Sequence, residues 1–326
     1  MNFRRICKFV FLNLIFCGIS FSQVYENSNL EKIFKTFPDT EITSCVVLKN
    51  GARQAEYFKT GYNRNSIFSV QSVSKSITSA IVGIALEEKL IPGLDTPIVK
   101  YFPELAKKSD RRYSKITIRH LLNNTSGLTS TDSSLWMEWR NSANWIEWLF
   151  SKPMVHEPGT VFDYSTGNTH LLSAIIQRVT GKTLYEYGKE KLFDKAGMKT
   201  VICEQDAQGI CDGGNGFLLS AYDMAFFGQL YLNGGKSGNV QIVPEPWIKD
   251  STKRQTDGAR YGFQWWQRNF GKKGYASFFA HGWGEQVIAV IPSAGLVITF
   301  TSRYPDNRKN QMYWKYISDI VDALEN

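Results

Sequence analysis

Two hydrophobic periods divide the chain into segments of different kinds. Short apolar or alternating runs, which are typical of strands, occupy residues 41–48, 52–59, 276–280, 286–291 and 295–301. Helical spacing of apolar residues covers residues 26–37, 72–90, 118–122, 145–150, 169–179, 184–193, 221–232 and 311–324. The predicted strands therefore lie near both ends of the chain, and helices dominate the middle.

The order of these segments predicts an α+β fold. Lys49, Asn50 and Gly51 separate the first two strands and are typical of a hairpin turn, which favours antiparallel pairing. We expect one domain over residues 23–326. Strands from both termini would form an antiparallel sheet in an α/β lobe (about 23–70 and 233–326), and residues of about 71–232 would form a helical lobe. A site between the two lobes is expected.

The first 22 residues have the pattern of a secretory signal. Residues 1–8 are basic, residues 9–19 are apolar, and residues 20–22 form a small-x-small cleavage site. We expect cleavage after Ser22, which would make the protein periplasmic or secreted. The apolar run is short for a membrane span, so no span is expected after cleavage; a retained anchor is the alternative.

Composition and charge narrow the class of protein. The chain has 326 residues, of which 43% are hydrophobic and 21% charged, so it is long enough to bury a large core. Its net charge is +8, but its lysines and arginines form no continuous run of the kind that binds nucleic acid. We therefore expect no nucleic-acid partner.

Three cysteines lie beyond the first 22 residues. Cys45 falls in a strand-like run and is expected to be buried as a small hydrophobic residue. Cys203 and Cys211 lie in a Gly- and Asp-rich stretch, where an exported protein could form a local disulfide. No spacing of cysteines and histidines suits a metal site, and no metal or other cofactor is expected.

The most informative motif is Ser72-Val73-Ser74-Lys75, which opens the apolar helical segment of residues 72–90. Residues three apart are neighbours on a helix, so Lys75 can reach the hydroxyl of Ser72. A serine hydroxyl needs an adjacent base to act as a nucleophile. The positive end of the helix and burial both favour the neutral amine, the form of lysine that accepts a proton. A motif this short also occurs by chance.

Two further positions carry candidate chemistry. Tyr164 follows a Pro-Gly turn and precedes a helical segment, so it lies on a loop, where it could act as a phenolate base or pass its proton to Lys75. His281 lies in an Ala-His-Gly-Trp-Gly sequence at the end of a predicted strand, where the glycines allow a ligand to approach closely. In isolation, a structural hydroxyl that caps a loop explains Tyr164 better, and a tight turn with a packed Trp is the alternative for His281.

Together these three motifs resemble the serine β-lactamase/penicillin-binding-protein superfamily. Ser72-x-x-Lys75, Tyr164-Ser-Thr and His281-Gly-Trp have the order and spacing of its class C-like branch, which includes esterases, D-aminopeptidases and 6-aminohexanoate-oligomer hydrolases. Residues 116–128 and 222–230 also resemble that branch, so the resemblance covers about residues 40–303. It implies a β-lactamase-like fold and a serine hydrolase.

The resemblance also implies a role for each matched residue. Ser72 would be the acylated nucleophile, and Lys75 and Tyr164 would be the proton-transfer pair. His281 matches the first residue of the family's third motif. The oxyanion hole would consist of the N–H groups of Ser72 and Gly284, and such fixed donors contribute roughly 3 kcal/mol each.

Two departures from the family pattern bear on the substrate. β-Lactamases of this branch carry Asn two residues after the tyrosine, where this chain has Thr166, and Asn168 is out of register. Trp283 replaces a usual glycine of the third motif. We therefore expect a small ester or amide substrate, bound near Thr166, Asn168 and Trp283. A β-lactamase or D,D-peptidase is the alternative, and a non-catalytic binding or sensor protein is a further one.

An aromatic segment leaves two interpretations open. Four tryptophans stand in two pairs with a spacing of three: Trp136, Trp139, Trp145 and Trp148. In this branch the corresponding loop walls the site, so Trp136 could line an apolar acyl pocket, but the spacing suits helix packing equally well. Asn123 and Asn124 begin Asn-x-Ser/Thr sequons, which we interpret as part of a turn rather than as glycan sites.

Overall fold

A seven-stranded antiparallel sheet is built from both ends of the chain. The computed structural model describes residues 24–25, 28–303 and 312–325, and within them this sheet has the order β1-β3-β2-β12-β11-β10-β9. Its strands are β1 (Val24–Tyr25), β2 (Ile42–Lys49), β3 (Ala52–Phe58), β9 (Trp266–Phe270), β10 (Tyr275–Gly282), β11 (Gln286–Ile291) and β12 (Leu296–Ser302). The predicted α+β fold is confirmed, and the expected signal at residues 1–22 lies outside the described residues.

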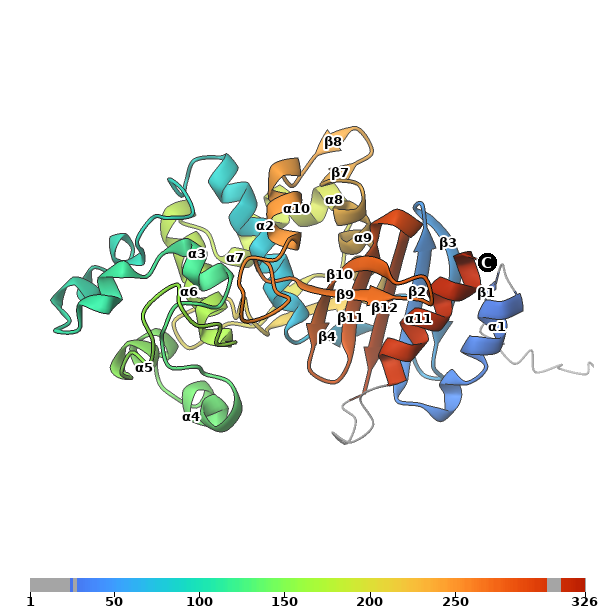
Figure 1. Cartoon of the computed structure of the whole chain (residues 1–326), viewed down its shortest axis with the longest axis horizontal. Helices are drawn as coiled ribbons and strands as arrows, with labels where there is room; N and C mark the ends of the chain where they lie inside the picture. The colour runs from blue at the N-terminus through green and yellow to red at the C-terminus, as the bar shows by residue number, and fades with distance from the viewer. Residues whose placement is uncertain (1–23, 26–27, 304–311, 326) are drawn as a thin grey trace, which may run out of the picture.

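Helices cover both faces of this sheet (Figure 1). Helices α1 (Ser28–Phe34) and α11 (Met312–Glu325) pack on one face, and α2 (Val73–Glu87) and α9 (Ala221–Leu232) pack on the other. Side chains of a strand point alternately to its two faces. In β10, Phe278 and Ala280 therefore join the core on the α2 side, whereas Phe279 joins the core on the α11 side. Cys45 is fully buried in β2, as predicted.

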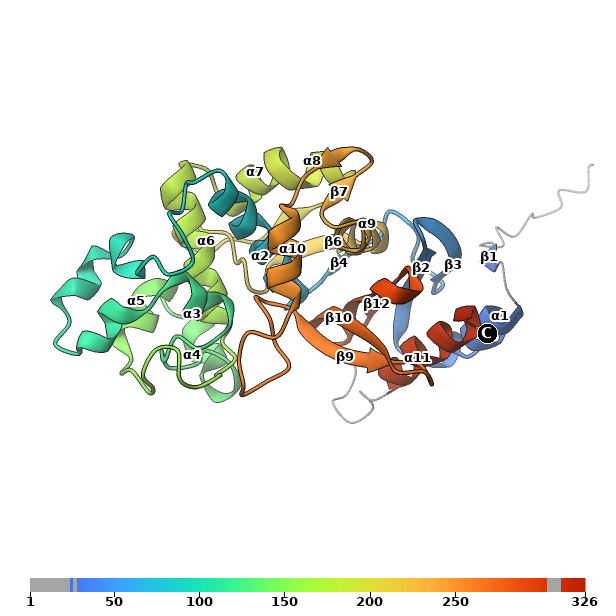
Figure 2. The same cartoon turned by 45° about the horizontal axis from the view of Figure 1, so that its top comes forward.

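The remaining helices form a lobe beside the sheet, seen at the left of Figures 1 and 2. They are α3 (Ile118–Leu122), α4 (Trp136–Arg140), α5 (Trp145–Ser151), α6 (Thr166–Thr180) and α7 (Leu184–Gly188). A π-helical turn (Lys189–Phe193) and α8 (Asp194–Ala196) follow, and α8 packs against α9 near the middle of the molecule. Helix α10 (Glu245–Thr252) packs on α2. None of the helices within the described ranges is long and apolar enough to cross a membrane.

Short elements complete the fold. Two small antiparallel sheets contain β4 (Ile67–Ser69), β5 (Ile202–Cys203) and β6 (Phe217–Ser220), and β7 (Lys236–Ser237) with β8 (Val240–Gln241). Short 3-10 helices lie at Phe37–Asp39, Ile98–Lys100, Pro103–Lys107, Arg111–Lys115, Ser133–Leu135 and Pro292–Ala294. The sequence pattern missed β9 because this edge strand leaves most of its residues at least partly exposed, so it lacks a clear apolar alternation.

Helix α2 occupies the centre of the molecule. Every residue from Val73 to Ala85 is buried, which explains why, apart from Lys75, its sequence is apolar or small on all sides. Its buried hydroxyls donate hydrogen bonds to backbone carbonyls of neighbouring segments: Ser76 Oγ to Gln264 and Thr78 Oγ1 to Gly213, at 2.6 and 2.7 Å. These bonds remove the cost of burying polar groups and fix α2 between the sheet and the helical lobe.

Candidate active site

Ser72 lies where the chain turns into α2. It is the N-cap residue of the helix, and Gln71 before it has a φ of 52°, a conformation that is costly for a residue other than glycine. Two backbone hydrogen bonds stabilise the turn, from Val73 N to Val70 O (3.1 Å) and from Ser74 N to Gln71 O (2.9 Å). The half-buried Ser72 side chain is thereby placed at the positive end of the helix.

Lys75 connects the nucleophile to the helical lobe. Its side chain is 1% exposed, and its Nζ donates hydrogen bonds of 2.9 Å each to Ser72 Oγ, Thr166 Oγ1 and Gly214 O. These three hydrogen-bond partners satisfy the buried amine, which would otherwise be costly to remove from water. The spacing of three along the helix thus brings Ser72 and Lys75 into direct contact.

Tyr164 lies on the loop that precedes α6, as the turn signal predicts, and its ring lies next to Lys75. Lys75 Nζ is 4.9 Å from the centroid of the Tyr164 ring. The ring stacks on Trp266 of β9 with centroids 5.7 Å apart, and the edge of Tyr261 lies 6.1 Å away. Burial, reinforced by the neighbouring Tyr164, raises the pKa of Tyr261 well above its ordinary value, so Tyr261 acts as a neutral packing partner.

Thr166 joins Lys75 to a carboxylate that was not predicted. Besides accepting from Lys75, Thr166 Oγ1 donates to Asp132 Oδ1 (3.1 Å), and Thr166 N donates to Asp132 Oδ2 (2.6 Å). Asp132 therefore satisfies an N–H group in the first turn of α6. This explains why α6 begins at Thr166 rather than near residue 169, because the bond comes from a segment distant in sequence.

The third motif approaches the nucleophile through its glycines. A Cβ added to Gly282 would lie 2.3 Å from Val70 O and 3.1 Å from Ser72 N, so only a glycine lets β10 come this close to the Ser72 turn. Gly284 follows in the turn to β11 with a φ of 75°. Its N–H is the candidate second oxyanion donor, and the neighbouring Trp283 side chain is 52% exposed.

His281 points to the opposite face of β10. Its ring lies 5.2 Å from the ring of Trp314 on α11, and its Nε2 is 3.4 Å from Glu285 Oε2, too far for a good hydrogen bond. Because strand side chains alternate, His281 shares a face with Phe279 rather than with Gly282. The structure therefore does not bring the imidazole together with Ser72, Lys75 and Tyr164.

One other expected contact residue, Asn168, has structural partners. Asn168 is buried; its Nδ2 donates to Asn124 Oδ1 (2.9 Å) and its Oδ1 accepts from Ser126 Oγ (2.7 Å). The buried Asn124 lies in a turn with a φ of 56°, in line with the interpretation of its sequon. These bonds connect α6 to that turn and occupy both the oxygen and the nitrogen of the Asn168 side-chain amide.

The tryptophan segment serves mainly for packing. Trp139, Trp145 and Trp148 belong to the buried core. Trp136 is half-buried, with its ring 5.5 Å from that of Trp139 and 5.5 Å from the Arg140 guanidinium carbon. None of the four lines the cavity that opens beside Tyr164.

That cavity has a volume of about 570 Å³. Its lining residues are Thr129, Ser130, Asp132, Ser134, Leu135, Val155, His156, Asp163 and Tyr164. Burial raises the pKa of the Asp163 carboxyl; nearby Asp132 adds to this effect and His156 opposes it. A larger cavity of about 670 Å³ contains none of these residues. The cavity beside Tyr164 is therefore the candidate substrate site; Tyr164 and Asp132 line it, whereas Ser72 and Lys75 do not.

Two residues of this site, Asp132 and Gly214, were not predicted from the sequence. Asp132 carried no distinguishing pattern. Gly214 contributes a backbone carbonyl, and the signal for it was the Gly213-Gly214 pair before an apolar run, since adjacent glycines indicate close backbone approach. A Cβ on Gly214 would indeed lie 2.6 Å from Thr166 Cγ2.

Comparisons with known proteins identify the family of this chain. The profile of the Beta-lactamase family matches residues 30–322. The 6-aminohexanoate-dimer hydrolase of Paenarthrobacter ureafaciens is 25% identical over 307 residues, covering 86% of this chain and 77% of that protein. Penicillin-binding protein 4* of Bacillus subtilis is 26% identical over 190 residues, covering 53% of this chain and 41% of that protein.

Solved structures show the same fold. A Bacillus anthracis protein proposed to be a 6-aminohexanoate-dimer hydrolase superposes with a TM-score of 0.77 and 27% identity, covering 91% of this chain and 82% of that one. The hydrolase EstCE1 superposes with a TM-score of 0.70 and 17% identity, covering 92% and 98% of the two chains. The chain therefore belongs to the Beta-lactamase family and is a serine hydrolase.

Proposed function

We propose that this hydrolase cleaves a small ester or amide through an acyl-enzyme on Ser72. The observation that carries the proposal is the 2.9 Å contact between Ser72 Oγ and the buried Lys75 Nζ, beside the Tyr164 ring. Ser72 Oγ attacks the substrate carbonyl carbon as its proton passes to the Lys75–Tyr164 pair, which then protonates the leaving group. Water, activated by the same pair, releases the acyl group. The N–H groups of Ser72 and Gly284 stabilise the oxyanion.

The charge of the cavity supports this substrate class. Asp132 and Asp163 both line it, so a neutral or cationic substrate enters more favourably than an anionic one. β-Lactams and D-Ala termini carry a carboxylate, which these side chains would repel, whereas a linear 6-aminohexanoate dimer also carries an ammonium group that balances its carboxylate. The relative that matches most of this chain is named as a hydrolase of a 6-aminohexanoate dimer, which supports an amide among the substrates.

A β-lactamase or D,D-peptidase activity is the second candidate. It is favoured by the similarity to penicillin-binding protein 4* and would use the same nucleophile. The two candidates differ in whether a substrate carboxylate is recognised.

Labelling with a fluorophosphonate probe tests the nucleophile. We expect mass spectrometry to find the label on Ser72 in the wild-type protein and in Ser134→Ala, which changes an exposed serine of the same cavity. Ser72→Ala should remain folded and unlabelled. A label on another serine, or none on the folded wild type, would overturn the assignment.

Substrate panels separate the two candidate functions. We expect turnover of p-nitrophenyl esters and of short linear amides, and slow or no turnover of nitrocefin. Rapid nitrocefin turnover, or stoichiometric labelling by fluorescent penicillin without ester hydrolysis, would favour the second candidate.

Export through the segment of residues 1–22 is a separate part of the proposal, supported by its basic, apolar and small-x-small pattern. Protein recovered from the periplasm or medium should begin at Gln23. An intact first segment on a protein found only in the cytoplasm would contradict it.

A further inference from the structure

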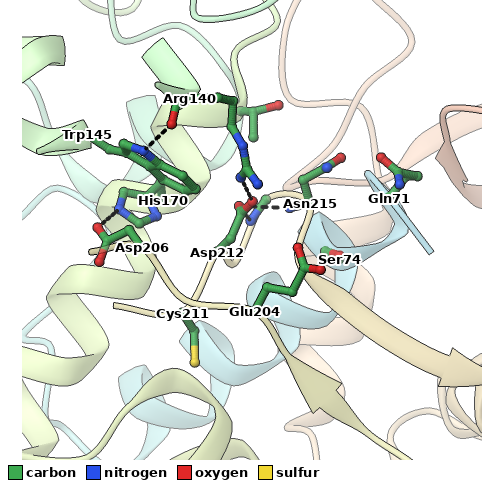
Figure 3. A network of polar contacts seen from close by, with 12 residues as sticks. Gln71, Ser74, Arg140, Trp145, His170, Glu204, Asp206, Cys211, Asp212 and Asn215 are labelled. Carbon is green, nitrogen blue, oxygen red and sulfur yellow. Dashed lines mark hydrogen bonds and ion pairs between the residues drawn. The ribbon is translucent and has the colours of Figure 1, made fainter. Parts of the chain in front are cut away.

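An ion pair with a buried carboxylate lies next to the Lys75 site. The Asp212 side chain is 1% exposed and pairs with the Arg140 guanidinium, as Figure 3 shows. While Asp212 Oδ2 contacts Arg140, its Oδ1 accepts two backbone hydrogen bonds, from Gly214 N (3.2 Å) and Asn215 N (3.1 Å). The carboxylate therefore fixes the turn that follows it.

This turn presents its carbonyls to α2. Gly214 O accepts from Lys75 Nζ at 2.9 Å, and Gly213 O accepts from Thr78 Oγ1 at 2.7 Å. The space around it is tight, because a Cβ on Gly214 would lie 2.9 Å from Thr166 O. A rotation of the peptide at Gly214 would remove one of the three acceptors that hold Lys75 against Ser72.

Arg140 is itself held in place by aromatic rings. Its guanidinium carbon lies 4.2 Å from the centroid of the Trp145 ring and 5.5 Å from that of Trp136. The Trp145 Nε1 also donates to Arg140 O at 3.1 Å. The charge that neutralises Asp212 is therefore attached to the rigid packing of α4 and α5.

We propose that Asp212, anchored by Arg140, is a positioning residue for Lys75. Its Oδ1 orients the Gly214 peptide, and the Gly214 carbonyl in turn fixes Lys75 Nζ on Ser72 Oγ. The inference rests on the proposed role of Lys75 as a base. Asp212 does not line the cavity beside Tyr164, so its loss should lower kcat and leave KM nearly unchanged.

The test compares Asp212→Ala, Asp212→Asn and Asp206→Ala with the wild type. Asparagine keeps an oxygen in the place of Oδ1, whereas alanine removes it. Asp206 is a matched control because it is also buried and accepts backbone bonds from Gln208 N and Ile210 N (2.9 Å each), but it pairs with His170 instead of ordering the turn at Gly214. We measure kcat, KM and the fluorophosphonate labelling rate of the folded fraction.

We expect Asp212→Ala to lower kcat and the Ser72 labelling rate about 10²-fold, the cost of a misplacement of about 1 Å at a catalytic group. Asp212→Asn should recover most of this loss, and Asp206→Ala should lower only the melting temperature. Unchanged kcat in Asp212→Ala, or an equal loss in the Asn and Ala variants, would overturn the proposal.

A second variant keeps the test decisive if Asp212→Ala does not fold. Arg140→Met retains the aliphatic packing on Trp145 but frees the Asp212 carboxylate, so kcat should fall about tenfold with KM unchanged; an unchanged kcat would overturn the proposal. A wild-type protein that is not labelled at Ser72 would instead refute the proposed function itself.

Discussion

Replacing Gly282 by alanine tests whether the close approach of β10 to Ser72 sets the rate of reaction. The new Cβ would lie 2.3 Å from Val70 O, whereas real Cβ contacts essentially never fall below 3.0 Å. Strand β10 and the Ser72 turn must therefore separate by about 0.7 Å. The opposing atom belongs to the backbone, so no side-chain rotation can relieve the contact.

The expected loss of rate follows from this displacement. The proposed oxyanion donors, the N–H groups of Ser72 and Gly284, lie on the two segments that move apart. Losing one such donor costs about 10²–10³-fold in kcat, and a misplacement of about 1 Å costs about 10²-fold. We therefore expect Gly282→Ala to lower kcat about 10²-fold. Overpacking should also reduce the free energy of unfolding by about 1–3 kcal/mol.

The assay must separate these two effects. Gly228→Ala is the matched control, because its Cβ would lie 2.6 Å from Val297 Cγ1 and 2.8 Å from Ile288 Cγ2, between α9 and the sheet. It should lower the melting temperature but leave kcat per fluorophosphonate-titrated active site unchanged. A wild-type kcat in Gly282→Ala, or the same loss of kcat in both variants, would refute the reasoning.

Three further predictions concern charge and oxidation. Lys75→Arg should lose turnover as completely as Lys75→Ala, because a guanidinium stays protonated, and Tyr164→Phe should lower kcat about 10²-fold; an active Lys75→Arg enzyme would exclude lysine as the base. Because the pKa of Asp163 is raised in the folded state, the stability it contributes is present at acid pH and is lost as the pH rises through that raised pKa. Asp163→Asn should therefore raise the melting temperature at neutral pH and not below about pH 4, and an advantage that grows toward acid pH would contradict this. Cys203 and Cys211 are free thiols in the structure, and each shifts the pKa of the other, so glutathione disulfide should join them and release two molecules of glutathione, stabilising the fold by roughly 2–3 kcal/mol. Peptide mapping that finds both thiols still free after oxidation would refute the pairing.

The residues of the site differ in how far the sequence could predict them. The contact between Ser72 and Lys75 follows from helix periodicity alone. Tyr164 could be joined to them only through the family resemblance, because no local pattern links it to α2. Asp132 and Gly214 reach Lys75 from other segments of the chain, through one hydroxyl and one backbone carbonyl, so no local propensity could reveal them.

His281 shows a different limit. The family pattern places it in the third motif, yet the alternation of Phe278, Ala280 and Gly282 toward α2 already indicates that His281 faces the other way. The start of α6 was predicted three residues late, because its first N–H group is satisfied by a tertiary contact with Asp132. In both cases the direction or end of an element depended on what packs against it.

The sheet pairs strands from both ends of the chain, and this determines the order in which the parts of the site form during folding. Thr43 of β2 and Thr301 of β12 share a hydrogen bond across 258 positions of sequence, and pairing over such separations is slow and late in folding. Strand β10, which lies against the Ser72 turn, begins at Tyr275. A nascent chain can therefore carry Ser72 and Lys75 on α2 long before Gly282 and Gly284 arrive beside them. We therefore expect hydrolysis to begin only after residues 275–302 have been synthesised and the sheet has closed, so that activity would report a folded sheet.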